Sequence, residues 1–387
     1  MTQHLKIIYI MMLMLLTISA CRRDDTVIYM EDENTGVATG HGSIVGMYIL
    51  NEGNMGSNKC TLDYLDLSNS TVHYLRNIYA ERNPSEVKEL GDVGNDIQLY
   101  GSRLWLVINC SNKVEVLRAS DAVKIGKVNI PNCRYVTFHE GYAYVSSYVG
   151  AVTQGSEAPL GMVYKVDTLT LQKVDSVVVG YQPEEMAVAD GQLYVANSGG
   201  YNFPSYDATV SQIDLRTMQQ VRQIEVATNL HHIKRDHYGQ LWVTSRGDYR
   251  NTESSISWLQ QDVQGQMQVG GRIDIPVSDL CIAGDSLYFY GSQWSETTMQ
   301  NRVVYGIINV ATHQIVTTSL SDAPELANIR MPYGIMVNPV ERDFYLMDAK
   351  NYVSSGELLH FRSDGTFDYK VRTGDIPAHA VFVFRKE

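Results

Sequence analysis

Residues 186–226 contain four short apolar segments that follow one another between polar turns. The sequence reads MAVADGQLYVAN at 186–197, ATVSQIDL at 208–215 and QVRQIEV at 220–226. The Asp190-Gly191 pair separates the first two segments and is a strong signal for a tight hairpin turn. Alternation of apolar and polar residues over so few positions is typical of half-buried strands. We therefore predict one four-stranded antiparallel sheet in this stretch.

The same unit recurs along the chain, marked by an aromatic residue in a short apolar run that often follows Gly-x-Leu. Successive aromatic residues are about 50 positions apart, and several strand segments fit in each interval. A repeat of this length with four strands is typical of a propeller blade. The marker residues are Tyr48, Trp105, Tyr144, Tyr194, Trp242, Tyr288 and Tyr345. We predict an all-β, seven-bladed β-propeller over residues 43–387, with almost no helix.

The two ends of this repeat predict how the ring closes. The first unit lacks an inner strand, because only a polar segment precedes Met47. The seventh unit is followed by a spare apolar run, 380–384, after its own fourth strand at 367–371. We expect this C-terminal strand to complete the first blade as its innermost strand, which removes two exposed sheet edges.

The N-terminal residues have the pattern of an export signal. Lys6 precedes an apolar run at 7–16 that is too short to span a bilayer permanently. Small residues then lead to Cys21, so residues 1–20 are expected to be a signal peptide. The segment Ile18-Ser19-Ala20-Cys21 resembles the bacterial lipobox, and this resemblance implies that cleavage leaves Cys21 as a lipidated first residue.

The residues after Cys21 predict where the protein is held. Arg22-Arg23-Asp24-Asp25 resembles the surface-export signals of Bacteroides-type lipoproteins, which implies a lipid-anchored protein on the outer membrane, facing outward. Residues 21–42 are polar and patternless, and we expect them to be a flexible tether.

Charge and missing motifs argue against several functions. The net charge of −12 is unsuited to nucleic acid, whose phosphates require clustered Lys and Arg. No HExxH, GxSxG, Walker or EF-hand motif is present, so we expect no enzymatic activity and no resident metal or cofactor. Cys60, Cys110, Cys133 and Cys281 lack zinc-type spacing and are expected to be buried free thiols.

Loop lengths indicate which face of the propeller binds a ligand. The turns on one face are short, such as 139–141 and 190–191, whereas the loops on the other include 146–160, 197–207 and 291–302. A rigid scaffold with elaborated loops on one face usually binds there. The inner strands begin at this face, and their first residues are expected to point into the channel. The candidate ligand-binding residues are Asp96, Arg134, Tyr135, Tyr181, Glu185, Asn197, Tyr201, His232, Arg246, Asp248, Trp294, Tyr333 and His379.

Several segments carry a resemblance to a known family. Tyr194-Val195-Ala196-Asn197-Ser198 resembles the YVTN signature of bacterial propellers. Ile49–Asn54, Leu90–Val93, Gly180–Pro183 and Gly374–Pro377 resemble Bacteroides YncE-like surface lipoproteins, a family that includes the cobalamin-binding BtuG proteins. The resemblance implies a propeller that captures cobalamin outside the cell and hands it to a BtuB-like TonB-dependent transporter, with the membrane reached only through the lipid anchor.

Two other functions fit the same residues. A surface glycan-binding propeller would also use tyrosine and tryptophan rings as stacking platforms. A lactonase-like hydrolase would need a metal. The residues from which such a site would be built are His231, His232 and His379 with Glu184, Glu185, Asp96 or Asp279. The more ordinary interpretation of these polar groups is that they line a wet channel and bond a ligand.

Overall fold

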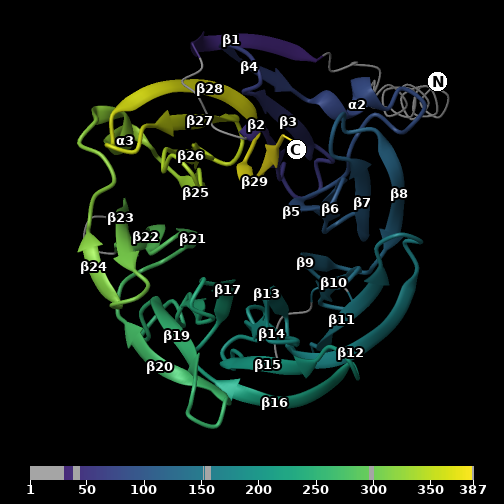
Figure 1. Ribbon diagram of the computed structural model, residues 1–387, viewed down its shortest axis with the longest axis vertical. Coiled ribbons are helices and arrows are strands. Elements are labelled where there is room, and N and C mark those ends of the chain that lie inside the picture. Colours follow the sequence, from purple (N-terminus) through teal and green to yellow (C-terminus); the bar gives the residue numbers. More distant parts are fainter. Residues whose placement is uncertain (1–29, 38–43, 151, 153–157, 296–299, 386–387) are drawn as a thin grey trace, which may run out of the picture. The chain divides into compact units, whose positions relative to one another are not determined.

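Seven antiparallel sheets are arranged in a ring around a central opening (Figure 1). The computed structural model describes residues 30–37, 44–150, 152, 158–295 and 300–385. From the inner strand outward, blade 1 consists of β29 (Pro377–Phe384), β2 (Ile44–Asn51), β3 (Thr61–Asp66), β4 (Thr71–Arg76) and β1 (Glu31–Val37). In the same order, blade 2 consists of β5 (Gly94–Tyr100), β6 (Arg103–Ile108), β7 (Lys113–Arg118) and β8 (Lys124–Asn129); blade 3 of β9 (Cys133–His139), β10 (Tyr142–Ser147), β11 (Leu160–Asp167) and β12 (Lys173–Tyr181); and blade 4 of β13 (Pro183–Ala189), β14 (Gln192–Asn197), β15 (Thr209–Asp214) and β16 (Gln219–Glu225). Blade 5 consists of β17 (Leu230–Arg235), β18 (Leu241–Ser245), β19 (Ser255–Gln261) and β20 (Met267–Ile273); blade 6 of β21 (Asp279–Ala283), β22 (Ser286–Ser295), β23 (Gln300–Asn309) and β24 (Gln314–Thr317); and blade 7 of β25 (Pro332–Val337), β26 (Phe344–Asp348), β27 (Ser355–Phe361) and β28 (Phe367–Asp375). This arrangement confirms the predicted seven-bladed propeller.

Helix contributes little to the part of the chain that the structure describes. Its two helices are α2 (Ile78–Arg82) and α3 (Pro324–Asn328), each five residues long. Within the described ranges, no helix has the length and apolar character needed to cross a membrane.

The repeating aromatic residue explains why the blades pack. All seven marker residues lie on the second strand of a blade, and each is at most 8% exposed. Trp242 of blade 5, for example, shares a hydrophobic cluster with Phe289 and Ile308 of blade 6. Tyr345 of blade 7 similarly packs in one cluster with Met47 of blade 1. The core is therefore a ring of apolar layers between neighbouring blades, and burial of these layers holds the ring together.

The C-terminal strand closes the ring as predicted. β29 pairs with β2 in antiparallel register, with Met47 opposite Phe382 and Ile49 opposite Ala380. Phe382 and Met47 belong to the cluster that joins blades 7 and 1. Blade 1 therefore combines strands from both ends of the chain, and the inner edge of β2 is covered.

One strand lies where the sequence predicted only a flexible tether. Residues 31–37 form β1, which pairs with β4 and adds a fifth strand to blade 1. The Glu31 carboxylate lies 2.5 Å from Arg76 of β4 and 2.6 Å from Arg372 of β28. The tether prediction is therefore corrected for residues 31–37, whose polar sequence is held by arginines far away in the chain. Cys21 and the signal peptide lie outside the described residues.

Candidate functional site

The starts of the inner strands surround a cavity of about 510 Å³ at one end of the channel. We call it the mouth pocket. Loop residues that follow β18 and β26 complete its wall, namely Arg246, Tyr249 and Tyr352. Its other lining residues are Glu52, Asn95, Arg134, Tyr135, His231, His232, Ser254, Val277, Ser278, Asp279, Tyr290, Ser292, Met331, Pro332, Tyr333 and His379. This volume is in the usual range for small-molecule sites.

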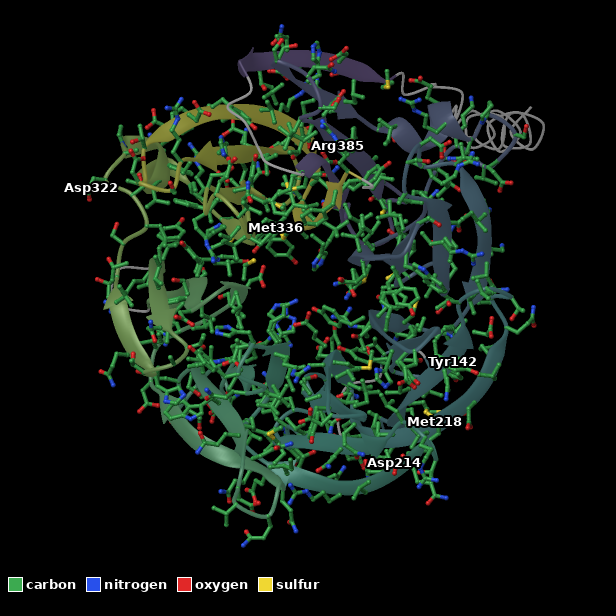
Figure 2. The ribbon with its side chains drawn as sticks, in the orientation of Figure 1. Tyr142, Asp214, Met218, Asp322, Met336 and Arg385 are labelled. Carbon is green, nitrogen blue, oxygen red and sulfur yellow. The ribbon has the colours of Figure 1, made fainter. Side chains whose placement is uncertain are left out.

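A second cavity of about 290 Å³ lies farther along the channel. We call it the lower cavity, and it is lined by residues from later positions of the inner strands, such as Lys234 and Met336. Met336 is labelled near the central opening in Figure 2, whereas Asp214 and Met218 lie out toward the periphery of blade 4. Tyr135, His232, Asp279 and His379 line both cavities and form the layer between them.

Two arginines of the mouth pocket share one buried carboxylate. Glu184 Oε2 accepts hydrogen bonds from Arg134 Nε and Nη2 at 3.2 and 3.1 Å, and its Oε1 accepts one from Arg246 Nη1 at 3.3 Å. The Tyr148 hydroxyl donates to the same Oε1 at 2.7 Å. Burial alone would raise the pKa of Glu184, but Arg134 and Arg246 hold it below its ordinary value. Glu184 is therefore an ionised anchor that fixes both guanidinium groups.

The opposite wall carries an acidic residue. Glu52, which follows β2 in blade 1, accepts a hydrogen bond from the Tyr333 hydroxyl at 3.1 Å. His379 Nε2 lies 3.5 Å from its other oxygen. Burial alone would lower the pKa of His379, but Glu52, Asp96 and Asp279 raise it above its ordinary value. The mouth pocket is thus polarised, with arginines on blades 3 and 5 and a carboxylate on blade 1.

A further ionic group fills the layer between the two cavities. His232 Nδ1 lies 3.1 Å from Glu185 Oε2, and its Nε2 lies 3.7 Å from Asp279. Lys234 pairs with the other oxygen of Glu185. Burial would raise the pKa of Glu185, but Lys234 and His232 lower it to about 2. Glu185 is therefore saturated by its own neighbours rather than open to a ligand.

His231 differs from its neighbour His232 because it faces the arginines. Its Nε2 lies 2.9 Å from the Tyr135 hydroxyl. Burial, and after it the charge of Arg246, lowers the pKa of His231 well below its ordinary value. The imidazole is therefore neutral and serves as a hydrogen-bonding group of the mouth pocket.

Aromatic side chains extend from the loops on the same side. Tyr201, Phe203, Tyr206 and Tyr249, which we call the rim aromatics, form edge-to-face contacts: Phe203 with Tyr206 at 6.0 Å and Tyr206 with Tyr249 at 6.3 Å between centroids. Tyr201 contacts Tyr148 in the same way, also at 6.3 Å. Tyr249 is 69% exposed and Phe203 44% exposed. These rings offer flat apolar surface to a ligand that is wider than the mouth pocket.

The structure brings together six of the predicted site residues in the mouth pocket: Arg134, Tyr135, His232, Arg246, Tyr333 and His379. Asp96 and Glu185 line the lower cavity instead. Burial raises the pKa of Asp96, whose carboxylate accepts a hydrogen bond from the backbone of Val136 at 2.9 Å.

Other predicted residues lie outside both cavities. Asn197 is fully buried and its amide donates to Thr209 and Ser211 within blade 4. Asp248 caps its own loop, accepting three backbone hydrogen bonds at 2.7 to 2.9 Å. Tyr181 ends β12, where its backbone N–H donates to Asp207. Tyr201 belongs to the rim aromatics, and the side chain of Trp294 lies outside the described residues.

Glu52 and Tyr290 were not among the predicted site residues, and Glu184 was expected only as one of the carboxylates from which a metal site would be built. Glu52 follows a second strand rather than beginning an inner one, and Tyr290 lies within β22. Glu52 could have been predicted from the sequence, because it directly follows the strand that contains Ile49-Leu50-Asn51. The second strand of each blade ends at the face of the propeller where the inner strand begins, which is the face of the mouth pocket. Within the described residues, no group of three or more His, Cys, Asp and Glu side chains is placed to hold a metal ion.

The fold and this cavity define a class: a seven-bladed β-propeller with a polar, preformed pocket at one end of its channel. The chain belongs to the family described as "Domain of unknown function (DUF5074)", whose model matches residues 45–366. No curated protein matches the sequence.

Solved structures are similar to this chain in fold. The hydrazine synthase of Kuenenia stuttgartiensis matches with a TM-score of 0.57 and 16% identity, over 74% of this chain and 88% of that one. A Bacteroides fragilis NCTC 9343 protein, provisionally described as a 6-phosphogluconolactonase, matches with a TM-score of 0.60 and 9% identity, over 89% and 99%. A functionally unknown protein of Desulfotomaculum acetoxidans DSM 771 matches at 0.55 and 10%, over 92% and 100%. At such identities the likeness shows the fold alone.

Proposed function

We propose that this protein is a surface lipoprotein that binds cobalamin at the mouth pocket and hands it to a TonB-dependent transporter of the outer membrane. The observation that carries the proposal is the mouth pocket, in which guanidinium, carboxylate, imidazole and phenol groups converge from blades around the ring. A pocket with these groups could bind several kinds of polar ligand. We choose cobalamin among them because segments of the sequence resemble cobalamin-binding surface propellers.

The chemistry of cobalamin matches the groups present. Its corrin rim bears amides, which need hydrogen-bond donors and acceptors such as Asn95 and Ser278. Its nucleotide tail has one phosphodiester, which suits the guanidinium groups of Arg134 and Arg246. Its flat faces suit the exposed ring of Tyr249.

The size of the pocket constrains the binding mode. Cobalamin is larger than the mouth pocket of about 510 Å³, so only part of the ligand enters it. The rest lies over the rim aromatics, which are on the same side of the propeller. Because the polar groups are already held by Glu184 and Glu52, little ordering is needed on binding, which favours high affinity.

In this proposal the protein captures its ligand and performs no chemistry on it. Glu185 is held by Lys234 and His232, and Glu184 by two arginines, so each of these carboxylates acts as a structural counter-ion. A role as general base would instead require a carboxylate whose pKa is raised, and in the channel Asp96 rather than Glu184 or Glu185 meets that condition, so the assay for hydrolysis below is a necessary test.

A second candidate function is the binding of surface glycans. The exposed rings of Phe203 and Tyr249 favour it, because sugar rings stack on flat aromatic surface.

Calorimetry with cyanocobalamin, a panel of oligosaccharides and a lactone hydrolysis assay separates these functions. We expect binding of cyanocobalamin with one site per chain, no glycan binding and no hydrolysis. Binding of an oligosaccharide without any cobalamin binding would contradict the proposal and favour the glycan function.

A further inference from the structure

We infer that Arg134, Arg246 and Glu184 together form an anion subsite that accepts a monoanionic phosphodiester. This inference rests on the proposed function for the identity of the whole ligand. The subsite lies on one wall of the mouth pocket and would bind one charged group of that ligand.

The first support is the set of unused donors. Each arginine uses only some of its guanidinium N–H groups to bond Glu184. Both side chains line the mouth pocket, where that of Arg134 is 18% exposed and that of Arg246 is 29% exposed. Across the described residues, Arg134 Nη1 and the Nε and Nη2 atoms of Arg246 have no hydrogen-bond acceptor. Guanidinium N–H groups that lack acceptors in a half-buried wall are suited to the oxygens of a phosphate or carboxylate.

The second support is the charge balance. Two guanidinium groups face one ionised carboxylate, so the wall keeps one positive charge in excess. The neighbours do not offset it: the pKa of His231 is lowered and that of Tyr148 is raised, so both are neutral. A partly buried excess charge is costly to leave unpaired. A monoanion balances it, whereas a dianion would leave a negative charge in the pocket.

The third support is that the arginines are fixed before a ligand arrives. Glu184 holds both guanidinium groups, and the Arg134 guanidinium carbon lies 5.0 Å from the centroid of the Tyr148 ring. Fixed donors lose little conformational freedom on binding. Glu52 on the opposite wall repels an anion, so the pocket orients a ligand with its phosphodiester toward blades 3 and 5.

Calorimetry with cyanocobalamin and dicyanocobinamide tests the subsite, because cobinamide retains the corrin ring but lacks the phosphodiester and the base. We expect Arg246→Gln to weaken cyanocobalamin binding about tenfold or more and to change cobinamide affinity by less than about twofold. Arg216→Gln is the matched control, because Arg216 is 85% exposed in the turn after β15 and its loss is expected to change neither affinity.

Equal weakening of both corrinoids by Arg246→Gln, or no effect on either, would overturn the subsite. If the wild-type protein binds neither corrinoid, the proposed function fails, and titration with dimethyl phosphate decides the subsite separately. We then expect dimethyl phosphate to bind the wild type and not Arg246→Gln; equal behaviour of the two proteins would refute the subsite.

A third variant tests the charge balance without removing an arginine. Glu184→Gln keeps a side chain of the same shape and raises the excess charge of the wall from one to two. We expect the ratio of affinities for methyl phosphate dianion and dimethyl phosphate to shift toward the dianion. A merely structural role of Glu184 predicts loss of both affinities with an unchanged ratio, and that result would contradict the inference.

Discussion

Two histidines in the channel are shifted in opposite directions by their surroundings. Desolvation, and after it the charge of Arg246, lowers the pKa of the half-buried His231, whereas Glu52, Asp96 and Asp279 together outweigh desolvation and raise the pKa of His379. The unperturbed pKa of histidine is about 6.5. At that pH the folded protein therefore favours the neutral form of His231 and the protonated form of His379 more than an unfolded chain does.

We predict that NMR titration of the histidine rings resolves this pair. His379 is expected to lose its proton above pH 6.5, and His231 to remain neutral well below it. The two histidines change the stability of the fold with pH in opposite directions. The contribution of His231 is complete above about pH 6.5, the pKa of histidine in the unfolded chain, and is lost as the pH falls from there through the lower pKa of His231 in the folded protein. The contribution of His379 is complete below the unfolded pKa and is lost as the pH rises through its folded pKa. Titration of His231 at or above pH 6.5, assigned with His231→Gln, would contradict the burial and charge described.

The marker aromatic residues carry the packing between blades. Trp242 is fully buried between blades 5 and 6. We predict that Trp242→Ala lowers the free energy of unfolding by about 3–5 kcal/mol, because it leaves a cavity between the blades. Denaturant unfolding measures the loss, with Val263→Ala as the control, since Val263 is 95% exposed. A loss below about 1 kcal/mol would show that this layer does not hold the blades together.

Sequence could identify which residues begin the inner strands but not where each side chain points. Glu184 and Glu185 are adjacent, yet one anchors the arginines of the mouth pocket and the other lies in the lower cavity. In a regular strand, adjacent side chains point to opposite faces of the sheet, so only one of the two would reach the channel. Both reach it here because the register of β13 shifts between Pro183 and Met186. A similar irregularity lies between Leu230 and Ile233, around the two histidines of β17. Bulges of this kind re-aim side chains and leave no clear mark in the sequence.

At the scale of elements, most strands were predictable because each is short, alternating and bounded by a turn signal. The turn after β15 is an example: Asp214 accepts backbone hydrogen bonds from Arg216 and Thr217, as its sequence indicates. β1 was not predictable, because its sequence EDENTGV has few apolar residues and its pairing depends on Arg76 and Arg372.

The closing strand gives a prediction at this scale. Truncation after Asp375 removes β29 and exposes the inner edge of β2 together with the cluster around Phe382. We expect insoluble protein or a loss of several kcal/mol in unfolding free energy, because core burial is lost. Truncation after Arg385 is the control and is expected to leave the melting temperature unchanged. An unchanged melting curve for the longer truncation would contradict closure by β29.

At the scale of the whole molecule, the proposed cellular role depends on where the chain is held. We predict that Cys21→Ala releases the protein from the outer membrane, because the lipid is attached at this residue in our proposal. Membrane fractionation measures the release, and protease added to intact cells tests surface exposure. An anchored protein that intact cells protect from protease would contradict the outward-facing orientation.

The most direct test of the proposed function is the position of cobalt in crystals of the protein soaked with cyanocobalamin. Anomalous scattering at the cobalt edge locates the metal without any assumption about the ligand pose. We predict one strong peak on the side of the propeller that carries the mouth pocket and the rim aromatics. A peak at another surface, or none at ligand concentrations that saturate known cobalamin binders, would contradict it.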